Sequence, residues 1–161
     1  MPKPATPGRQ PNAAKRAHIL LTTDGSPESL RAVPMACDLA RHLGARITLL
    51  QVVPELQATA EGGLATPLGV LHHTTEAEVA TVRTRLVQAI PMFAGTDVDL
   101  DIEMAETAAG GIVHYANRHG VDLIAMASHG RTGLRRLLLG STATAVLRQS
   151  HIPVVIFPLV R

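Results

Sequence analysis

The chain has 161 residues, of which 46% are hydrophobic and 17% charged, a size and composition typical of one globular domain. Its single cysteine excludes an intramolecular disulfide and a cysteine-rich metal site, and its 2% aromatic content argues against a stacking surface for single-stranded nucleic acid. The net charge of +2 includes four basic and no acidic residues in 1–16, so the remaining chain carries 11 basic and 13 acidic groups. This nearly neutral body argues against a double-stranded DNA reader, which needs a basic face.

Residues 1–16 contain four prolines and no apolar run of the length found in signal peptides. We interpret them as a disordered basic tail that precedes a domain at 17–161, and one open alternative is that this tail binds a nucleic acid or a membrane surface by charge alone. No stretch is long and apolar enough for a membrane span. We therefore expect a cytoplasmic protein without a membrane partner, and the single cysteine fits a reducing compartment.

Elements of the first half follow from apolar runs and helix-end signals. Ile19–Leu21 is expected to be a buried strand, and Ser26 is expected to begin a helix that ends at Gly44. Pro34 falls inside this helix and should kink it. The apolar run 47–53 predicts a second strand.

A long loop is expected at 54–73, because prolines and glycines interrupt this stretch. Thr75 and Glu78 have the spacing of a capping box, which predicts the start of a second helix. Its apolar face is expected to contain Val79, Val82, Leu86 and Ile90.

Between residues 97 and 103, apolar and acidic residues alternate with a period of two. This period is typical of a strand with one face in solvent, so we expect an edge strand. The acidic residues, Asp97, Asp99, Asp101 and Glu103, are interpreted as its wet face and not as a metal site.

The remaining elements are a helix at 108–119, a strand at 123–127, a helix at 141–148 and a strand at 152–160. Strands and helices thus alternate along the chain, which predicts an α/β fold: an open five-stranded parallel sheet with helices on both faces. In such folds a ligand binds beyond the carboxyl ends of the strands, where the strand order reverses.

Two strand ends carry the residues of a phosphate-binding site. Gly130 and Gly140 allow a ligand to approach the backbone closely, and Arg131 adds positive charge. Ser141 and Thr142 begin a helix, where free amide groups attract anions. The purely structural alternative is that the glycines only form turns and that Ser141 is only a helix N-cap.

Asp24 ends the first strand and can accept hydrogen bonds from a ribose or a base, or help to hold a metal ion on phosphates, although Asp before Gly is also ordinary turn chemistry. His129 lies within the same segment as Gly130 and can stack on or hydrogen-bond a nucleotide. No partner for a general base is evident. His72 and His73 lack a second ligand pair and are interpreted as solvent-exposed, so no metal site is predicted.

The spacing of these residues resembles a known family. The segment 127–130, followed after nine residues by Gly140 and Ser141, is similar to the signature of the ATP-binding branch of the universal stress proteins. Segments 24–26, 121–124 and 152–156 resemble the same family, so that the likeness extends over residues 17–158.

The resemblance implies a Rossmann-like fold of the adenine nucleotide alpha hydrolase type, and ATP, with magnesium or manganese, as the ligand. It implies that Thr22 and Asp24 contact the nucleoside and that the backbone of Val52 meets the adenine. By position, the ribose and phosphate contacts are Ala127, Gly130, Gly140, Ser141 and Thr142. It also implies a homodimer joined through the last strand, and a stress-response or signalling role.

Ala127 departs from the family's pattern, because the first glycine of the motif is expected there. A left-handed backbone at this position would cost roughly 1–2 kcal/mol with alanine, and the methyl group could crowd a ribose. This leaves open a nucleotide-free dimeric scaffold that acts through protein partners. An ATP pyrophosphatase is a weaker alternative, because the loop at 23–27 lacks that group's pattern, and no base–nucleophile pair indicates more than slow hydrolysis.

Overall fold

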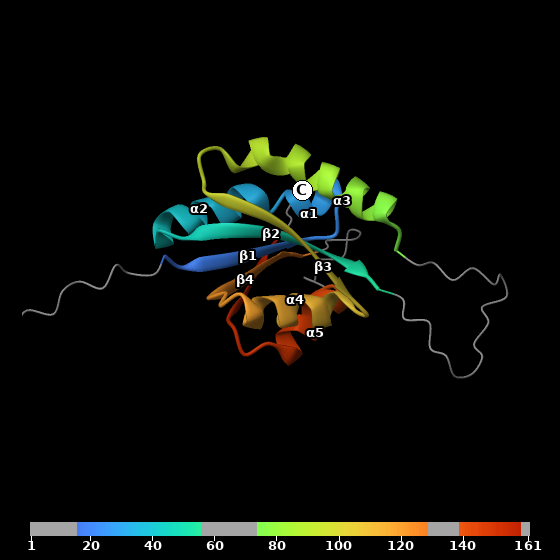
Figure 1. The fold of residues 1–161 in the computed structure, drawn as a ribbon. Helices are drawn as coiled ribbons and strands as arrows, with labels where there is room; N and C mark the ends of the chain where they lie inside the picture. The colour runs from blue at the N-terminus through green and yellow to red at the C-terminus, as the bar shows by residue number, and fades with distance from the viewer. Residues whose placement is uncertain (1–15, 56–73, 129–138, 159–161) are drawn as a thin grey trace, which may run out of the picture.

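A computed structural model describes residues 16–55, 74–128 and 139–158. These residues form one five-stranded sheet in the order β3-β2-β1-β4-β5, and every neighbouring pair of strands is parallel (Figure 1). The strands are β1 (His18–Thr23), β2 (Arg46–Pro54), β3 (Val98–Ala105), β4 (Leu123–Ala127) and β5 (Val154–Phe157). The predicted α/β fold is confirmed.

Helices cover both faces of the sheet. They are α1 (Pro27–Leu30), α2 (Val33–Leu43), α3 (Glu76–Ala89), α4 (Ala108–Arg118) and α5 (Ser141–Gln149), and a 3-10 turn, η1 (Ile90–Phe93), follows α3. Helices α1, α2 and α3 lie on one face, and α4 and α5 lie on the other (Figure 1). Successive residues of β1, such as Leu20 and Leu21, therefore point to opposite faces and belong to two different core clusters, as expected for a parallel strand buried on both sides.

The helix predicted from Ser26 to Gly44 is instead two helices, so the predicted kink is wrong. Its ends are as expected, because the Ser26 side chain caps α1 and Gly44 ends α2 with a φ of 60°. Pro34 lies in the first turn of α2 and α1 ends at Leu30, four residues earlier. Proline lacks an N–H and its ring clashes with the carbonyl four residues before it, so a new helix starts here.

The capping box that starts α3 is confirmed. The Thr75 side chain accepts from the Glu78 backbone N–H, and the Glu78 side chain accepts from the Thr75 backbone N–H. The predicted apolar face is wrong at Ile90, which is 43% exposed, because the buried side continues through Ala89 to Phe93. Helix α3 gives way to the tighter η1 turn at this point, so the helical spacing no longer applies.

β3 is an edge strand, as predicted, but its acidic face is only partly in solvent. Asp99 is exposed, whereas Glu103 is 8% exposed. Helix α4 covers this end: Arg118 Nη2 lies 2.9 Å from Glu103 Oε2, and the Tyr115 hydroxyl donates to Asp101 Oδ2 at 2.7 Å. The wet-face interpretation is therefore wrong for the carboxyl half of the strand.

Several predicted segments fall outside the described residues. These are most of the tail, 56–73 of the expected loop, and the end of the last strand, which is described as β5 up to Phe157. The division of the chain at residues 16 and 17 stays a prediction. Within the described ranges, every helix is too short or too polar to cross a membrane.

Candidate functional site

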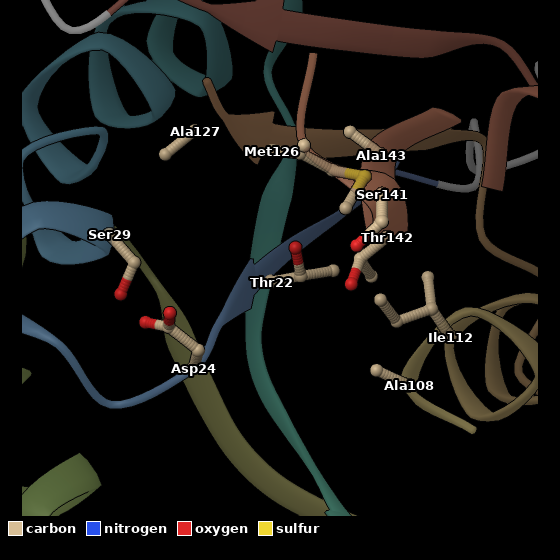
Figure 2. A pocket seen from close by; sticks show the side chains of 11 residues that line it. Thr22, Asp24, Ser29, Ala108, Ile112, Met126, Ala127, Ser141, Thr142 and Ala143 are labelled. Carbon is tan, nitrogen blue, oxygen red and sulfur yellow. The ribbon is translucent and has the colours of Figure 1, made fainter. Parts of the chain in front are cut away.

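A cavity of about 280 Å³ lies where the strand order reverses. β1 has β2 on one side and β4 on the other, so the crossovers that start beside β1 run in opposite directions along the sheet. The cavity lies beyond the carboxyl ends of β1 and β4 and is bordered by the first turns of α4 and α5 (Figure 2). Its lining residues are Thr22, Asp24, Ser29, Ala108, Ile112, Met126, Ala127, Gly140, Ser141, Thr142 and Ala143. We call it the switch-point cavity.

A hydrogen-bonded loop holds Asp24 at the rim of this cavity. Asp24 Oδ1 accepts from the Ser26 backbone N–H at 2.9 Å and from its hydroxyl at 2.5 Å. Thr23 Oγ1 and Ser29 Oγ lie 2.6 Å apart, which ties the end of β1 to α1. The turn interpretation of Asp24 is thus correct, and the same turn also presents an exposed carboxylate to the cavity.

The first turn of α5 presents backbone N–H groups to the cavity. The N-cap residue is Gly140, which has no side chain to cap the helix, so Ser141 is the first helical residue and not the N-cap. The first turns of α1, α3 and α4 are capped by Ser26, Thr75 and Thr107, whereas α2, like α5, has no side-chain cap. Uncapped N–H groups and the positive end of the helix dipole favour an anion at this place.

The hydroxyl groups of Ser141 and Thr142 add donors to this first turn. Figure 2 shows both side chains in the cavity on the side opposite Asp24, with Thr22 between them. The site therefore has a donor-rich end at α5 and a carboxylate end at the β1 loop. A ligand with an anionic group at one end and hydroxyl or amino donors at the other matches this distribution.

Ala127 fits its position without backbone strain. It pairs with Phe157 in the β4–β5 ladder, and among the described non-glycine residues only Ala94 has a positive φ. Its methyl group belongs to the core cluster beneath α2, whereas Met126 belongs to the cluster beneath α4. The two side chains point apart in Figure 2. The free-energy cost of a left-handed backbone at alanine therefore does not apply at this position.

Val52 does not line the cavity, and its side chain packs toward α4, where a Cβ added to Gly111 would lie 2.7 Å from Val52 Cγ1. The backbone groups of successive β2 residues point alternately toward β1 and β3. Arg46 N–H donates to Ala17 O on the β1 side, and Ile47 N–H donates to Asp97 O on the β3 side, so even-numbered residues face β1. The backbone groups of Val52 therefore face the β1 side, one residue beyond the last β1–β2 pair at Gln51.

Six of the predicted residues line one cavity: Thr22, Asp24, Ala127, Gly140, Ser141 and Thr142. His129, Gly130 and Arg131, like His72 and His73, lie outside the described residues. Sequence reasoning missed the apolar wall formed by Ala108, Ile112, Met126 and Ala143, and the buried Ser29. A search at helix starts that follow strands would have found Ala108 and Ala143, and the other three carry no local signal.

Two acidic residues at the start of β3 form ion pairs with arginines. Arg16 Nη1 lies 2.9 Å from Asp97 Oδ2, and Arg46 Nη1 lies 3.0 Å from Asp99 Oδ2. In the described ranges, no three histidine, cysteine or acidic side chains come together as a metal-binding group. The described lining of the switch-point cavity contains hydroxyl groups and one carboxylate but no histidine, cysteine or lysine.

Comparisons with a family model and with known proteins point to the same family. The model of the Universal stress protein family matches residues 15–158. A universal stress protein of Methanocaldococcus jannaschii is 32% identical over 142 residues, which cover 86% of this chain and 79% of that protein. Universal stress protein A homolog 1 of Coxiella burnetii is 30% identical, over 81% of this chain and 88% of its own length.

Solved structures share the fold. A universal stress protein in complex with cAMP superimposes with a TM-score of 0.63 at 22% identity, over 90% of this chain and 98% of that one. A universal stress protein from Archaeoglobus fulgidus in complex with dAMP has a TM-score of 0.64 at 16% identity, over 88% and 97% of the two chains. At these identities the likeness establishes the fold alone.

Proposed function

The chain belongs to the universal stress protein family, and we propose that its switch-point cavity binds an adenine nucleotide, with ATP as the physiological ligand. The observation that carries the proposal is the pairing, in one cavity, of the uncapped first turn of α5 with the carboxylate of Asp24. The N–H groups of the α5 turn suit phosphate oxygens, and the Asp24 carboxylate suits ribose hydroxyls or the donors of a base.

The distribution of groups in the cavity supports one orientation of the proposed nucleotide. Phosphates lie at the N–H groups of α5 and the hydroxyls of Ser141 and Thr142, and the nucleoside lies toward Asp24 and Thr22. The adenine extends along the carboxyl end of the sheet toward the backbone of Val52, which faces the β1 side. Ile112 and Met126 supply an apolar surface for the flat faces of the ring system.

Two observations support this choice of ligand, one on relatives and one on this chain. The solved universal stress proteins that share the fold include complexes with cAMP and with dAMP, both of which are adenine nucleotides. The ordinary backbone at Ala127 also removes one of the two reasons to favour a nucleotide-free scaffold, the backbone strain of an alanine at this position.

We propose a cytoplasmic signalling role with at most slow hydrolysis. Hydrolysis at a useful rate requires a group that activates water and a group that stabilises the leaving phosphate. Among the described lining residues, Asp24 is the ionisable side chain, and its Oδ1 already accepts two hydrogen bonds from Ser26. If ATP binds with magnesium or manganese, Asp24 is also the carboxylate of the described lining that would meet the ion.

The test is calorimetric titration of the purified chain with ATP, AMP and cAMP, with and without magnesium. Co-purified nucleotide is first identified by ion-exchange chromatography after denaturation. We expect saturable binding of ATP, and Thr142→Ala should weaken it by about tenfold, because a hydroxyl bond to a charged oxygen is lost. Ala108→Trp should abolish binding, because Ala108 is exposed and its new side chain fills the cavity.

Thr144→Ala is the matched control, because Thr144 lies on the same helix but does not line the cavity. It should leave the affinity for ATP unchanged. The proposal is wrong if the folded wild type binds none of the three nucleotides, or if Ala108→Trp binds ATP as tightly as the wild type does. The first result would favour the scaffold that acts through protein partners.

A further inference from the structure

A second cavity, of about 410 Å³, lies on the opposite face of the sheet. It lies between the carboxyl end of β2 and the first half of α3, and it shares no lining residue with the switch-point cavity. Its lining residues are Val53, Pro54, Thr74, Glu78, Thr81, Val82 and Arg85. We call it the α3 cavity.

The wall of the α3 cavity is apolar. Val53 and Val82 are each 8% exposed and belong to the core cluster beneath α2 and α3, and Pro54 extends this surface. The two threonines add little donor capacity, because the Thr74 hydroxyl donates to Pro54 O at 2.6 Å and the Thr81 hydroxyl donates to Ala77 O at 2.8 Å. The body of a ligand here must therefore be mainly apolar.

The two charged side chains of the cavity, Glu78 and Arg85, differ in their hydrogen bonds. Glu78 Oε2 accepts from the Thr75 backbone N–H at 2.7 Å, as part of the capping box of α3. Arg85, two turns further along the same helix, is exposed and makes no hydrogen bond or ion pair with another described residue. The guanidinium is thus the charge that the described part of the chain leaves available to a ligand.

A buried amide lies next to this guanidinium. Gln51 is 8% exposed, and its Oε1 has no hydrogen-bond partner among the described residues. Arg85 Nη1 and Gln51 Oε1 lie 2.9 and 3.0 Å from the position that a Cβ would take on Gly25, so both groups contact the same glycine. An unpaired buried amide oxygen is uncommon in folded proteins, and here it places an acceptor beside the guanidinium, while Gln51 itself does not line the α3 cavity.

We propose that the α3 cavity binds a small organic carboxylate with an apolar body. The carboxylate pairs with the Arg85 guanidinium, whose planar donors match it. Gln51 lies behind this polar end, where its buried amide oxygen is an acceptor close to the guanidinium. The body packs on Val53, Pro54 and Val82, and the site is independent of the nucleotide site on the other face.

The test is a titration of the full ¹⁵N-labelled chain, followed by NMR, with 3-phenylpropanoate and with its neutral analogue 3-phenylpropanamide. We expect saturable shifts at the amides of Val53 and Val82 with the carboxylate. The neutral analogue should bind at least about tenfold more weakly, because it cannot form the charged pair. Arg85→Gln should weaken the carboxylate by a similar factor.

Arg83→Gln is the matched control, because Arg83 is exposed on the same helix but does not line the cavity. It should bind 3-phenylpropanoate as the wild type does.

Absence of saturable shifts, equal affinity for the neutral analogue, or wild-type affinity in Arg85→Gln would each overturn the proposal. Competition between ATP and 3-phenylpropanoate would overturn the independence of the two sites. Failure of ATP to bind would leave this second site unaffected, because the two cavities share no lining residue.

Discussion

His18 is a buried ionisable side chain whose tautomer follows from its neighbours. It is 1% exposed at the amino end of β1. Arg46 Nη2 lies 3.0 Å from His18 Nδ1, and a guanidinium can only donate, so Nδ1 accepts. The hydrogen is then on Nε2, which donates to Thr48 Oγ1 at 2.8 Å. Burial and, next, the charge of Arg46 lower the pKa of this imidazole, so it is held neutral.

We expect His18 to make the fold less stable in mild acid. Its pKa is lowered in the folded state from a value of about 6.5 in the unfolded chain. As the pH falls below that value, the unfolded chain takes up the proton first, so the free energy of unfolding decreases until the folded-state pKa is reached. Urea unfolding at pH 7.5 and at pH 5 measures this loss.

His18→Gln is the comparison for this measurement, because glutamine can still hydrogen-bond but does not titrate. The variant should lose less stability than the wild type between the two pH values. Equal losses in both proteins would assign the pH dependence to other groups and contradict the role given to His18.

At the scale of single elements, signals within a few residues predicted structure well. The capping box of Thr75 and Glu78, the cap at Ser26 and the helix end at Gly44 were all predicted, because each depends on local backbone chemistry. The burial of Glu103 was not predicted, because it depends on α4, whose packing against β3 is not evident from the pattern of β3 alone.

The same distinction holds for the candidate site. Residues at strand ends and helix starts, such as Asp24 and Ser141, were predicted because the parallel topology brings those ends together. Ile112 and Met126 were missed, because an apolar residue in a helix or strand looks the same in the sequence whether it lines a cavity or fills the core. The predictions for 129–131 concern residues outside the described ranges.

Gly111 sets the distance between α4 and the sheet. A Cβ at this position would lie 2.7 Å from Val52 Cγ1 and 2.9 Å from Ala105 Cβ, so Gly111→Ala must push α4 away from β2 and β3. We expect a loss of about 1–3 kcal/mol in the free energy of unfolding. Nucleotide affinity should fall as well, because Ala108 and Ile112 of the same helix line the switch-point cavity. Urea unfolding and calorimetric titration measure the two effects.

Gly44→Ala separates these two effects. Gly44 has a φ of 60° and open space around it, so alanine there costs backbone energy without a clash, roughly 1–2 kcal/mol. It lies at the far end of α2 from the cavity residues of the β1 loop. It should destabilise the fold and leave nucleotide affinity unchanged. A parallel loss of affinity in Gly44→Ala would show that the Gly111 effect reflects stability alone.

At the scale of the whole molecule, the two edges of the sheet differ in character. The β3 edge carries acidic residues, several of them in ion pairs with arginines. At the other edge, β5 is a short run of four apolar residues, of which Val154, Val155 and Ile156 are only partly buried. An apolar edge strand can pair with a second strand, and charged residues oppose such pairing. The asymmetry favours β5 as the place of self-association.

We propose that the chain forms a homodimer through β5, and the alternation of backbone groups supplies a selective test. Ile124 N–H donates to Pro153 O, and Ser128 N–H donates to Phe157 O. The backbone N–H and C=O groups of odd-numbered β5 residues therefore point toward β4, and those of even-numbered residues point away from the sheet. The N–H of Ile156 therefore points away from the sheet, and Ile156→Pro removes a donor that only a partner strand would use.

Light scattering after size exclusion should give a dimer for the wild type and a monomer with an unchanged circular dichroism spectrum for Ile156→Pro. Val155→Pro is the matched variant: its N–H faces β4, so we expect it to weaken the fold itself, seen as a lower midpoint of urea unfolding. A monomeric wild type would exclude the dimer. A dimeric, folded Ile156→Pro would show that the two chains associate through another surface, since a proline there removes the outward donor that pairing through the β5 edge requires.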